Sequence, residues 1–200
     1  MALAMTDKVL ADHGPTDGTG LWVKRAVLVV LGILALAMAA KIKVPVPPSP
    51  VAVSMGTFAV LTIAAAYGPR LGLTTILGYM LIGYLGFDVF QSSSAEAFGW
   101  TYMTGATGGY LVGYVLATLA LGALARRGWD RSVLLMAIAM LIGNVLIYVP
   151  GILWLGYLYT WNEPILEWGL TPFLIGDAMK LALAALLLPL SWALVGKARG

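Results

Sequence analysis

Two charged residues, Asp177 and Lys180, lie within 171–190, a stretch dominated by Leu, Ala, Ile, Phe, Met and Pro. They are three residues apart, so on a helix they share one face. A charge in hydrocarbon costs about 2.5 kcal/mol or more, and such residues almost always face the interior of a helix bundle. A purely structural ion pair is the alternative, but buried pairs often add little net stability. We interpret the pair as a site for a polar ligand that donates and accepts hydrogen bonds.

The rest of the chain has the composition of a membrane protein. Of its 200 residues, 60% are hydrophobic and 10% are charged, and the mean hydropathy is +0.91, whereas soluble domains carry about 25% charged residues. The chain has no Cys, and its single His lies in the polar N-terminal segment, which excludes thiolate and histidine chemistry from the apolar part. A net charge of +3 is too small to indicate a nucleic-acid partner. No nucleophile–base pair or metal cluster is recognisable, so we expect neither an enzyme nor a cofactor.

A polar segment (1–20) precedes six apolar stretches, and we expect it to be a flexible or weakly helical cytoplasmic tail. The stretches run roughly over 22–40, 54–67, 71–86, 104–125, 132–155 and 171–195. A membrane-spanning helix needs about 20 residues, and the second and third stretches are shorter than that. Because only 67–72 separates them, they predict a tight helical hairpin, with one long kinked helix as the alternative. The sequence thus predicts an all-α integral membrane protein whose six transmembrane helices occupy 21–197.

The first apolar stretch also has the pattern of a cleavable signal peptide, with a basic start, an apolar run and small residues at its end. Two features favour a retained helix instead. A polar tail precedes the basic pair, Lys24 and Arg25, and five more apolar stretches follow. We therefore interpret the stretch as the first membrane span.

The distribution of Lys and Arg predicts the orientation of the spans. With six spans and a cytoplasmic N-terminus, only Lys41 and Lys43 lie on the outer side. The cytoplasmic side then holds Lys8, Lys24, Arg25, Arg70, Arg126, Arg127, Arg131, Lys197 and Arg199. This nine-to-two bias places both termini in the cytoplasm. At about 1.5 Å rise per residue, Asp177 and Lys180 lie roughly 9–14 Å below the outer end of their helix.

Small and polar residues at the outer end of the fourth stretch form a second group of interest. Glycines recur every fourth residue over 105–113, a spacing that lets helices approach closely. The same glycines leave backbone N–H groups at a helix N-terminus open to a ligand. We expect ligand contact here from Thr107, Gly108, Gly109 and Tyr110. In the fifth stretch Asn144 and Tyr148 share a face, as polar contacts between helices or as further ligand contacts.

The outer loops have the composition of a cover for a pocket. The loop over 41–54 holds four prolines, which resist helix formation, so we expect it to be extended and semi-rigid. The loops over 86–100 and 156–169 are polar and carry several aromatic residues. Most of these aromatics suit the membrane interface. Together the three loops predict a pocket that opens outward.

Five segments, in this order and spacing, resemble the BioY family: PVPPSPVAVSMGTFAV, YGPRLG, GYLGFDVF, TGATGGYLVGY and PFLIGDAMK. The resemblance covers about 40–190. BioY proteins are biotin-binding substrate components (S components) of energy-coupling factor (ECF) transporters. The resemblance implies six membrane spans, cytoplasmic termini and a biotin pocket beneath the outer loops. A stand-alone carrier, or an S component for thiamin or riboflavin, remains the alternative, as does a membrane enzyme using Asp177.

The resemblance also implies roles for particular residues. Asp177 and Lys180 become pocket residues facing biotin, whose ureido ring has two N–H donors and a carbonyl acceptor. Further contacts are expected from the segment around Thr107 to Tyr110 and from the loop around Phe90 and Gln91. Two positions depart from the family pattern, which usually has Pro at Asp88 and at Ala106. Because both positions lie near the expected pocket, we expect these departures to affect the geometry of its loops and its affinity for biotin.

The first helix carries a candidate docking surface. Ala35 and Ala39 are four residues apart, and two small residues on one face leave a flat strip where another helix can pack. Packing within the bundle is the alternative. The resemblance implies that such a strip contacts the transmembrane coupling subunit, which works with paired ATPases in a bacterial cytoplasmic membrane. The chain itself has no P-loop of the form GxxxxGK[ST], so it depends on partners or a gradient for energy.

Overall fold

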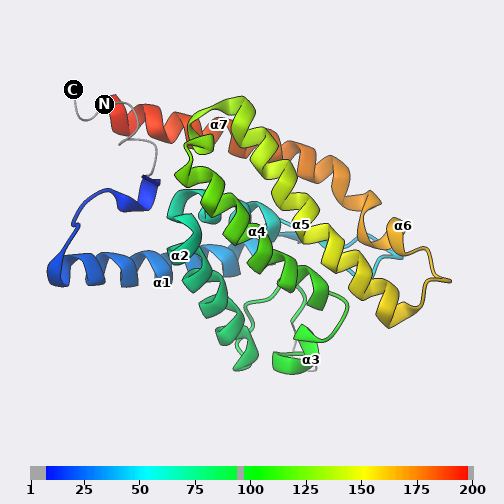
Figure 1. Cartoon of the computed structure of the whole chain (residues 1–200). Helices are drawn as coiled ribbons and strands as arrows, with labels where there is room; N and C mark the ends of the chain where they lie inside the picture. Colours follow the sequence, from blue (N-terminus) through cyan, green and yellow to red (C-terminus); the bar gives the residue numbers. More distant parts are fainter. Residues whose placement is uncertain (1–7, 94–96, 198–200) are drawn as a thin grey trace.

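The structure, a computed structural model, describes residues 8–93 and 97–197 and is nearly all helical (Figure 1). The elements in chain order are η2 (Leu10–Asp12), α1 (Gly18–Lys41), β1 (Lys43–Val44), β2 (Val53–Ser54), α2 (Gly56–Tyr84), α3 (Gly99–Met103), α4 (Gly108–Arg126), η3 (Trp129–Arg131), α5 (Val133–Tyr159), α6 (Ile165–Gly169), η4 (Thr171–Phe173) and α7 (Leu174–Lys197). The two strands form one antiparallel pair, with Lys43 opposite Ser54. They give the proline-rich segment the extended start and end that the sequence predicts.

Among the described residues, five segments are long and apolar enough to cross a membrane. They are Gly18–Lys41, Gly56–Tyr84, Gly108–Arg126, Val133–Tyr159 and Ile165–Val195. Apolar stretches of this length fold as helices because hydrocarbon offers the backbone no hydrogen-bonding partner outside the segment itself. The chain is therefore a multi-pass helical membrane protein.

The second and third predicted stretches meet inside α2 without a loop between them. Only Gly68 leaves the helical region, with φ 74° and ψ 178°, and Pro69 follows it. Positive φ is open to glycine at little cost, and proline lacks the N–H that a continuing helix needs. The helix changes direction at this point, and by length and composition it counts as one candidate span. Five long helical segments are thus observed where the sequence predicts six, and the sixth transmembrane helix is not confirmed.

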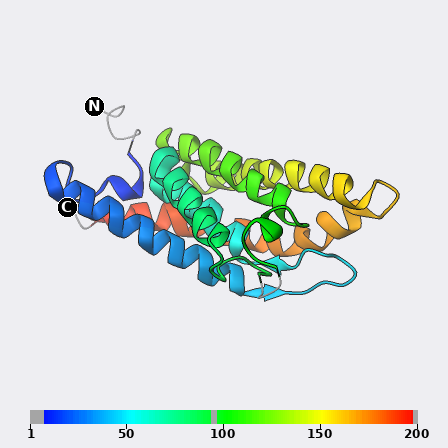
Figure 2. The same ribbon diagram turned by 90° about the horizontal axis from the view of Figure 1, so that it is seen from below.

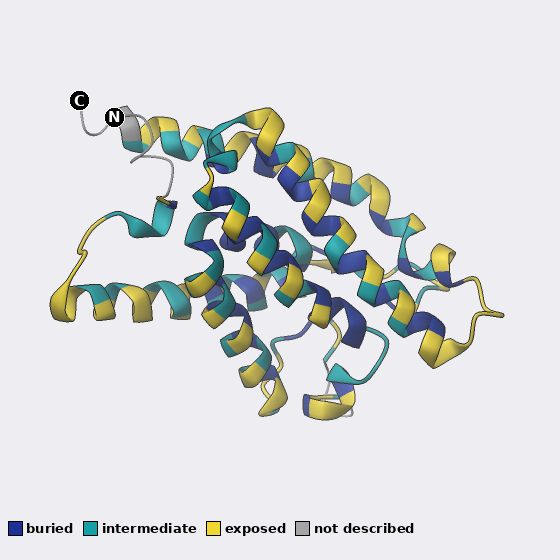
Figure 3. Ribbon diagram, viewed as in Figure 1, coloured by how far each residue is buried: buried dark blue, intermediate teal, exposed yellow. Residues whose placement is uncertain are grey.

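The centre of the bundle is α4, which packs between α2 and α5. Figure 3 shows its buried face continuous with those of both neighbours, whereas α1 and α7 carry long exposed stripes. Residues 0–1% exposed lie along these three central helices, among them Leu61, Ile76, Leu121, Met140 and Ile147. The outward stripes of α1 and α7 are apolar, as expected of surfaces that face lipid.

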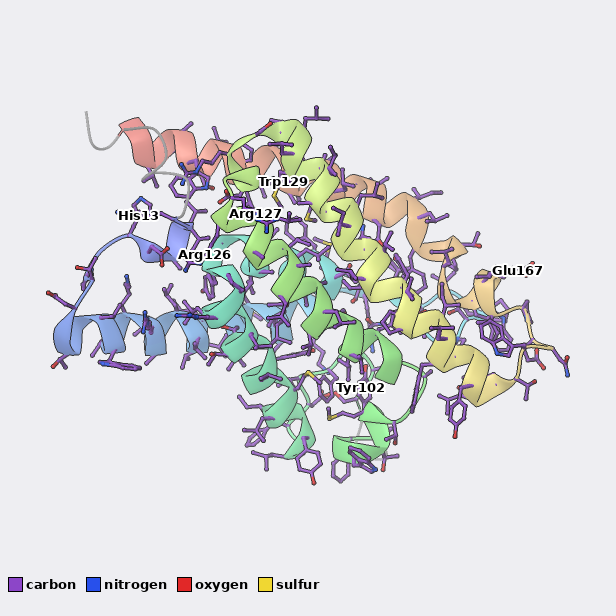
Figure 4. All side chains as sticks on the ribbon, in the orientation of Figure 1. His13, Tyr102, Arg126, Arg127, Trp129 and Glu167 are labelled. Carbon is purple, nitrogen blue, oxygen red and sulfur yellow. The ribbon has the colours of Figure 1, made fainter. Side chains whose placement is uncertain are left out.

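The described part of the polar tail packs onto the end of the bundle. Val9 is fully buried against the core, and the Asp12 carboxylate lies 3.2 Å from Arg126 of α4. The His13 ring meets Trp192 of α7 edge-on at 5.4 Å. Figure 4 shows His13 and Arg126 beside η2. Residues 8–13 are thus attached to the bundle, and α1 begins at Gly18, inside the segment predicted as tail.

The proline-rich loop projects from the opposite end of the molecule and lies beside α6 in both views (Figures 1 and 2). The Ser49 hydroxyl bonds the backbone oxygen of Trp168 at 2.6 Å, and Val51 is buried in the main core. These contacts hold the loop across the end of the bundle opposite to η2. The proline-rich segment therefore forms part of the wall of the site described below.

Gly113 sets the distance between α4 and α5, because a Cβ there would lie 2.6 Å from the Cα of Ile147. We expect Gly113→Ala to destabilise the protein by about 1–3 kcal/mol, the usual cost of overpacking, because backbone atoms cannot move aside as a side chain can. Thermal unfolding in detergent measures the effect. Gly176→Ala is the matched control, since the nearest atom to its Cβ is a Val53 side-chain carbon 3.5 Å away. Equal unfolding temperatures for the two variants would contradict this explanation.

Candidate functional site

The predicted charge pair is buried and almost saturated with hydrogen bonds. The Lys180 ammonium contacts the Asp177 carboxylate at 3.0 Å, the Ser54 backbone oxygen at 2.6 Å and the Thr57 hydroxyl at 3.1 Å. The other Asp177 oxygen accepts a hydrogen bond from the Tyr148 hydroxyl. All three N–H donors of the ammonium therefore have protein acceptors, while each carboxylate oxygen retains a lone pair.

The pair is inward-facing because of its register on the last helix. The buried positions of α7 are Asp177, Lys180, Ala184, Ala185 and Leu188, and Phe173 of η4 precedes them. Apart from the neighbouring Ala185, they are spaced by three or four residues, as a single helical face requires. Asp177 lies in the first turn of α7, where the helix dipole favours an acid. The inward face of α7 thus carries the two charges to the start of α2, which supplies their partners.

A narrow cavity lies beside the pair, beneath the proline-rich loop and the segment that follows α2. It is lined by Ala40, Val51, Ala52, Ser54, Thr57, Tyr79, Phe90, Gln91, Tyr102, Thr107, Tyr110, Leu111, Tyr114, Tyr148, Phe173 and Lys180. Its lining is mostly apolar and aromatic, with a few polar groups, which is the usual make-up of a small-molecule site. Its volume for water-sized molecules is about 40 Å³, room for a few waters. A vitamin-sized ligand therefore requires the loops or side chains around it to move apart.

Two loops cover this cavity, the proline-rich loop over 45–52 and the segment over 85–93 that follows α2. Phe90 is 1% exposed and stacks on Tyr102 of α3, with ring centroids 4.7 Å apart. The Gln91 amide nitrogen donates to the Ala52 oxygen at 2.5 Å and so joins the two loops. Figure 4 shows Tyr102 close to where α3 meets α4. The aromatic stack forms one wall of the cavity and the Gln91 amide part of its cover.

The structure brings most of the predicted binding residues to one place. Lining the cavity are Phe90, Gln91, Thr107, Tyr110, Tyr148 and Lys180. Asp177 lies directly behind them, 5% exposed and bonded to both Lys180 and Tyr148. Tyr110 is fixed by a hydrogen bond from its hydroxyl to the Gly169 oxygen at 2.8 Å. Three helices, α4, α5 and α7, and the loop that follows α2 thus supply the site.

Besides Asp177, three predicted residues do not line the cavity. A Cβ at Gly108 would lie 2.3 Å from the Met103 oxygen, and one at Gly109 would lie 2.3 Å from the Pro150 oxygen. These glycines allow close packing of α4 with its neighbours, the alternative that their spacing also indicated. Asn144 is buried in α5 one turn before Tyr148. Ligand contact by these three residues remains a prediction.

Several lining residues were not identified from the sequence. Tyr114 lies one turn after Tyr110 on the same face of α4, so its i+4 spacing was a usable signal. Ser54 and Thr57 gave no such signal, because they act at the junction of β2 and α2, whose position depends on the whole fold. Tyr102 stands just before the fourth predicted stretch, and only its position against Phe90 reveals its role.

The two alanines of the expected docking surface, Ala35 and Ala39, are half-buried on α1. One edge of this alanine strip packs against the smaller of two hydrophobic clusters, which α1 forms together with α2. Beside them, Leu34 and Met38 are 53% and 65% exposed. The alanines therefore border an exposed apolar stripe of α1, which leaves one edge of the small-residue strip open.

Comparison with known proteins identifies relatives over most of the chain. The BioY family model matches residues 6–197. A probable biotin transporter BioY of Pyrococcus horikoshii is 31% identical over 137 residues, which are 68% of this chain and 78% of that protein. A biotin transporter BioY of Thermotoga maritima is 28% identical over 137 residues, with the same two shares.

A solved structure shares the fold. The crystal structure of the S-component for biotin from an ECF-type ABC transporter covers 87% of this chain and 93% of its own, with a TM-score of 0.75 and 18% identity. Identity at that level supports the architecture alone. Together with the family match over 6–197, which confirms the resemblance seen in the sequence motifs, it leads to one assignment: the chain belongs to the BioY family.

Proposed function

We propose that this chain captures biotin from the outer side of the membrane as the substrate-binding S component of an ECF-type transporter. The observation that carries the proposal is the buried Asp177–Lys180 pair beside a cavity under the outer loops, in a member of the BioY family. Support comes from the relatives, which are named biotin transporters. The function is binding and transport, and no reaction is assigned to the site.

The charges at the cavity favour one orientation of the vitamin. The positive charge of Lys180 is already neutralised by Asp177, and all three N–H donors of its ammonium are bonded to protein acceptors. A carboxylate buried beside such a pair would lack a free positive charge, which is costly. The neutral ureido ring therefore lies at the inner end, where its N–H groups meet remaining acceptor lone pairs. The valerate carboxylate points toward the loops, where Lys43 lies above Gln91.

The proposed topology has six membrane crossings, with both termini in the cytoplasm of a bacterial cell. The two halves of α2, before and after Gly68, would each cross once. The nine-to-two distribution of cations supports this orientation. So does the contact of His13 with Trp192, because it places η2 and the end of α7 at the same end of the molecule. The cavity lies toward the other end, below the loop that contains Lys41 and Lys43.

The proposed partners are the transmembrane coupling subunit and the ATPases of an ECF module. The chain has no P-loop of its own, so ATP hydrolysis must come from other subunits. The half-buried strip of Ala35 and Ala39 on α1 is the proposed contact for the coupling subunit. It suits helix packing because small side chains let two backbones approach closely.

Competition binding tests the ligand. We expect purified protein to bind biotin and to ignore thiamin and riboflavin, because those vitamins lack a ureido ring. An analogue whose carboxylate is converted to an amide should bind within about tenfold of biotin. An analogue with an altered ureido ring should lose about 100-fold, the typical cost of leaving buried polar groups without partners. Tighter binding of thiamin or riboflavin than of biotin would overturn the proposal, and the reverse order of the two analogues would overturn the orientation.

A further inference from the structure

An ionic contact joins the end of α1 to one of the two loops that cover the cavity. The Lys41 ammonium lies 2.5 Å from an Asp88 carboxylate oxygen. The Ser93 hydroxyl donates to the same oxygen at 2.5 Å and lies 3.4 Å from the ammonium. Lys41 is the last residue of α1, where the helix dipole favours a cation. These three residues, from two separate segments, form a compact polar cluster at the outer surface.

The cluster lies beside a second link between the same two segments. The Lys43 ammonium donates to the Gln91 backbone oxygen at 2.6 Å, and the Gln91 side chain donates to the Ala52 oxygen. The proline-rich loop begins just after Lys43, so both of its ends are joined to the segment over 88–93. Hydrogen bonds therefore join the segment over 88–93 to both ends of the proline-rich loop, and the ion pair joins the same segment to the end of α1.

The segment between these contacts belongs to the cavity. Phe90 and Gln91 line it, and they lie between Asp88 and Ser93 in the chain. The Ser93 hydroxyl also lies 3.1 Å from the Phe90 backbone oxygen. Because the cavity is too narrow for a vitamin unless its surroundings move, the contacts that hold this segment to α1 oppose opening.

We propose that Lys41, Asp88 and Ser93 form an electrostatic clamp that positions the Phe90–Gln91 segment over the site and slows release of the ligand. This inference rests on the proposed function, because it assumes that the cavity takes biotin. The three residues act on the ligand through the loop and are positioning residues.

The solvent exposure of the clamp determines its strength and its sensitivity to salt and to pH. The Lys41 and Asp88 side chains are 36% and 67% exposed, and exposed ion pairs are weak and screened by salt. Removing the pair should therefore speed release by about two- to fivefold. The Lys41 hydrogen bond, then that of Ser93, lowers the pKa of Asp88 below its ordinary value, and Lys43 acts in the same direction. The clamp is thus present at neutral pH and is lost in acid, as the pH falls through this lowered pKa of Asp88.

A double-mutant cycle on the full chain in nanodiscs tests the clamp. The variants are Lys41→Met, Asp88→Asn and the pair together, and the measurement is the dissociation rate of labelled biotin at low and high salt. Each single variant should release biotin about two- to fivefold faster, and the double variant no faster than either single one. Salt should accelerate release from the wild type and leave the Asp88→Asn variant nearly unchanged.

Glu163→Gln is the matched control, because it removes an exposed acid from another outer loop. It should leave the rate and its salt dependence as in the wild type. Additive effects of Lys41→Met and Asp88→Asn, or equal salt dependence in wild type and Asp88→Asn, would overturn the clamp while leaving biotin binding established. Failure of the wild type to bind biotin would instead overturn the proposed function.

Discussion

Lys180→Met is expected to weaken biotin binding by about 100-fold or more, the largest effect of any single change in the site. It leaves the Asp177 carboxylate buried with only the Tyr148 hydroxyl as a partner. Truncating one member of a buried, hydrogen-bonded charge pair typically costs about 2–5 kcal/mol in affinity, and breaking such a pair costs about 3–5 kcal/mol in folding stability. Isothermal titration with biotin, together with thermal unfolding, measures both effects.

A second variant separates binding from folding. Asp177→Asn combined with Lys180→Met removes both charges and keeps the shape of the site, so most of the lost stability should return. Binding should stay weak, because the amide offers the ureido N–H groups one neutral acceptor oxygen in place of a carboxylate, and the cation that holds that carboxylate is gone. Wild-type affinity in the double variant would show that the pair is a structural contact alone, the alternative weighed from the outset.

Ala39→Trp should abolish co-purification with the coupling subunit and leave biotin binding within about twofold of the wild type. Ala39 lies on the half-buried edge of the exposed stripe of α1, near the C-terminal end of that helix. An indole there fills the strip along which a second helix would approach, and close approach is what small residues provide. Ala35→Trp, one turn earlier, should act in the same way. Co-expression with an ECF module and pull-down on the module gives the measurement.

The matched control for the docking surface is Leu141→Trp. Leu141 is 57% exposed on α5, so the same indole there faces lipid away from α1. That variant should assemble normally and unfold at the wild-type temperature. Loss of assembly in both variants would mean that added bulk on any outer face blocks the complex, and normal assembly of Ala39→Trp would reject the docking surface.

The apolar stretches, the inward charge pair and the membership of the family could be read from the sequence alone. Long apolar stretches form helices in lipid because no other backbone arrangement satisfies its hydrogen bonds there. The spacing of Asp177 and Lys180 placed them on one face of the last helix. Their cost in hydrocarbon required that this face point inward, and the structure places both side chains there.

The kink in α2 shows a feature that local sequence signals determine only in part. The sequence YGPRLG predicted a turn between two helices, and a glycine followed by a proline does break the helix at Gly68. Whether the chain inserts a loop there depends on what the break packs against. In this fold a Cβ at Gly122 of α4 would lie 2.4 Å from the Pro69 nitrogen. The close contact between the break in α2 and α4 needs a glycine on the other helix, far away in the sequence.

The polar tail and the partners of Lys180 were decided by tertiary structure for the same reason. Val9 begins a run of only three apolar residues in a polar segment, and it is buried only because other elements form a recess for it. Ser54 and Thr57 hold Lys180 from more than 120 residues away, a contact that no spacing rule records. Composition and periodicity determined which residues lie inside the bundle. The packing of distant segments alone decided which of them meet.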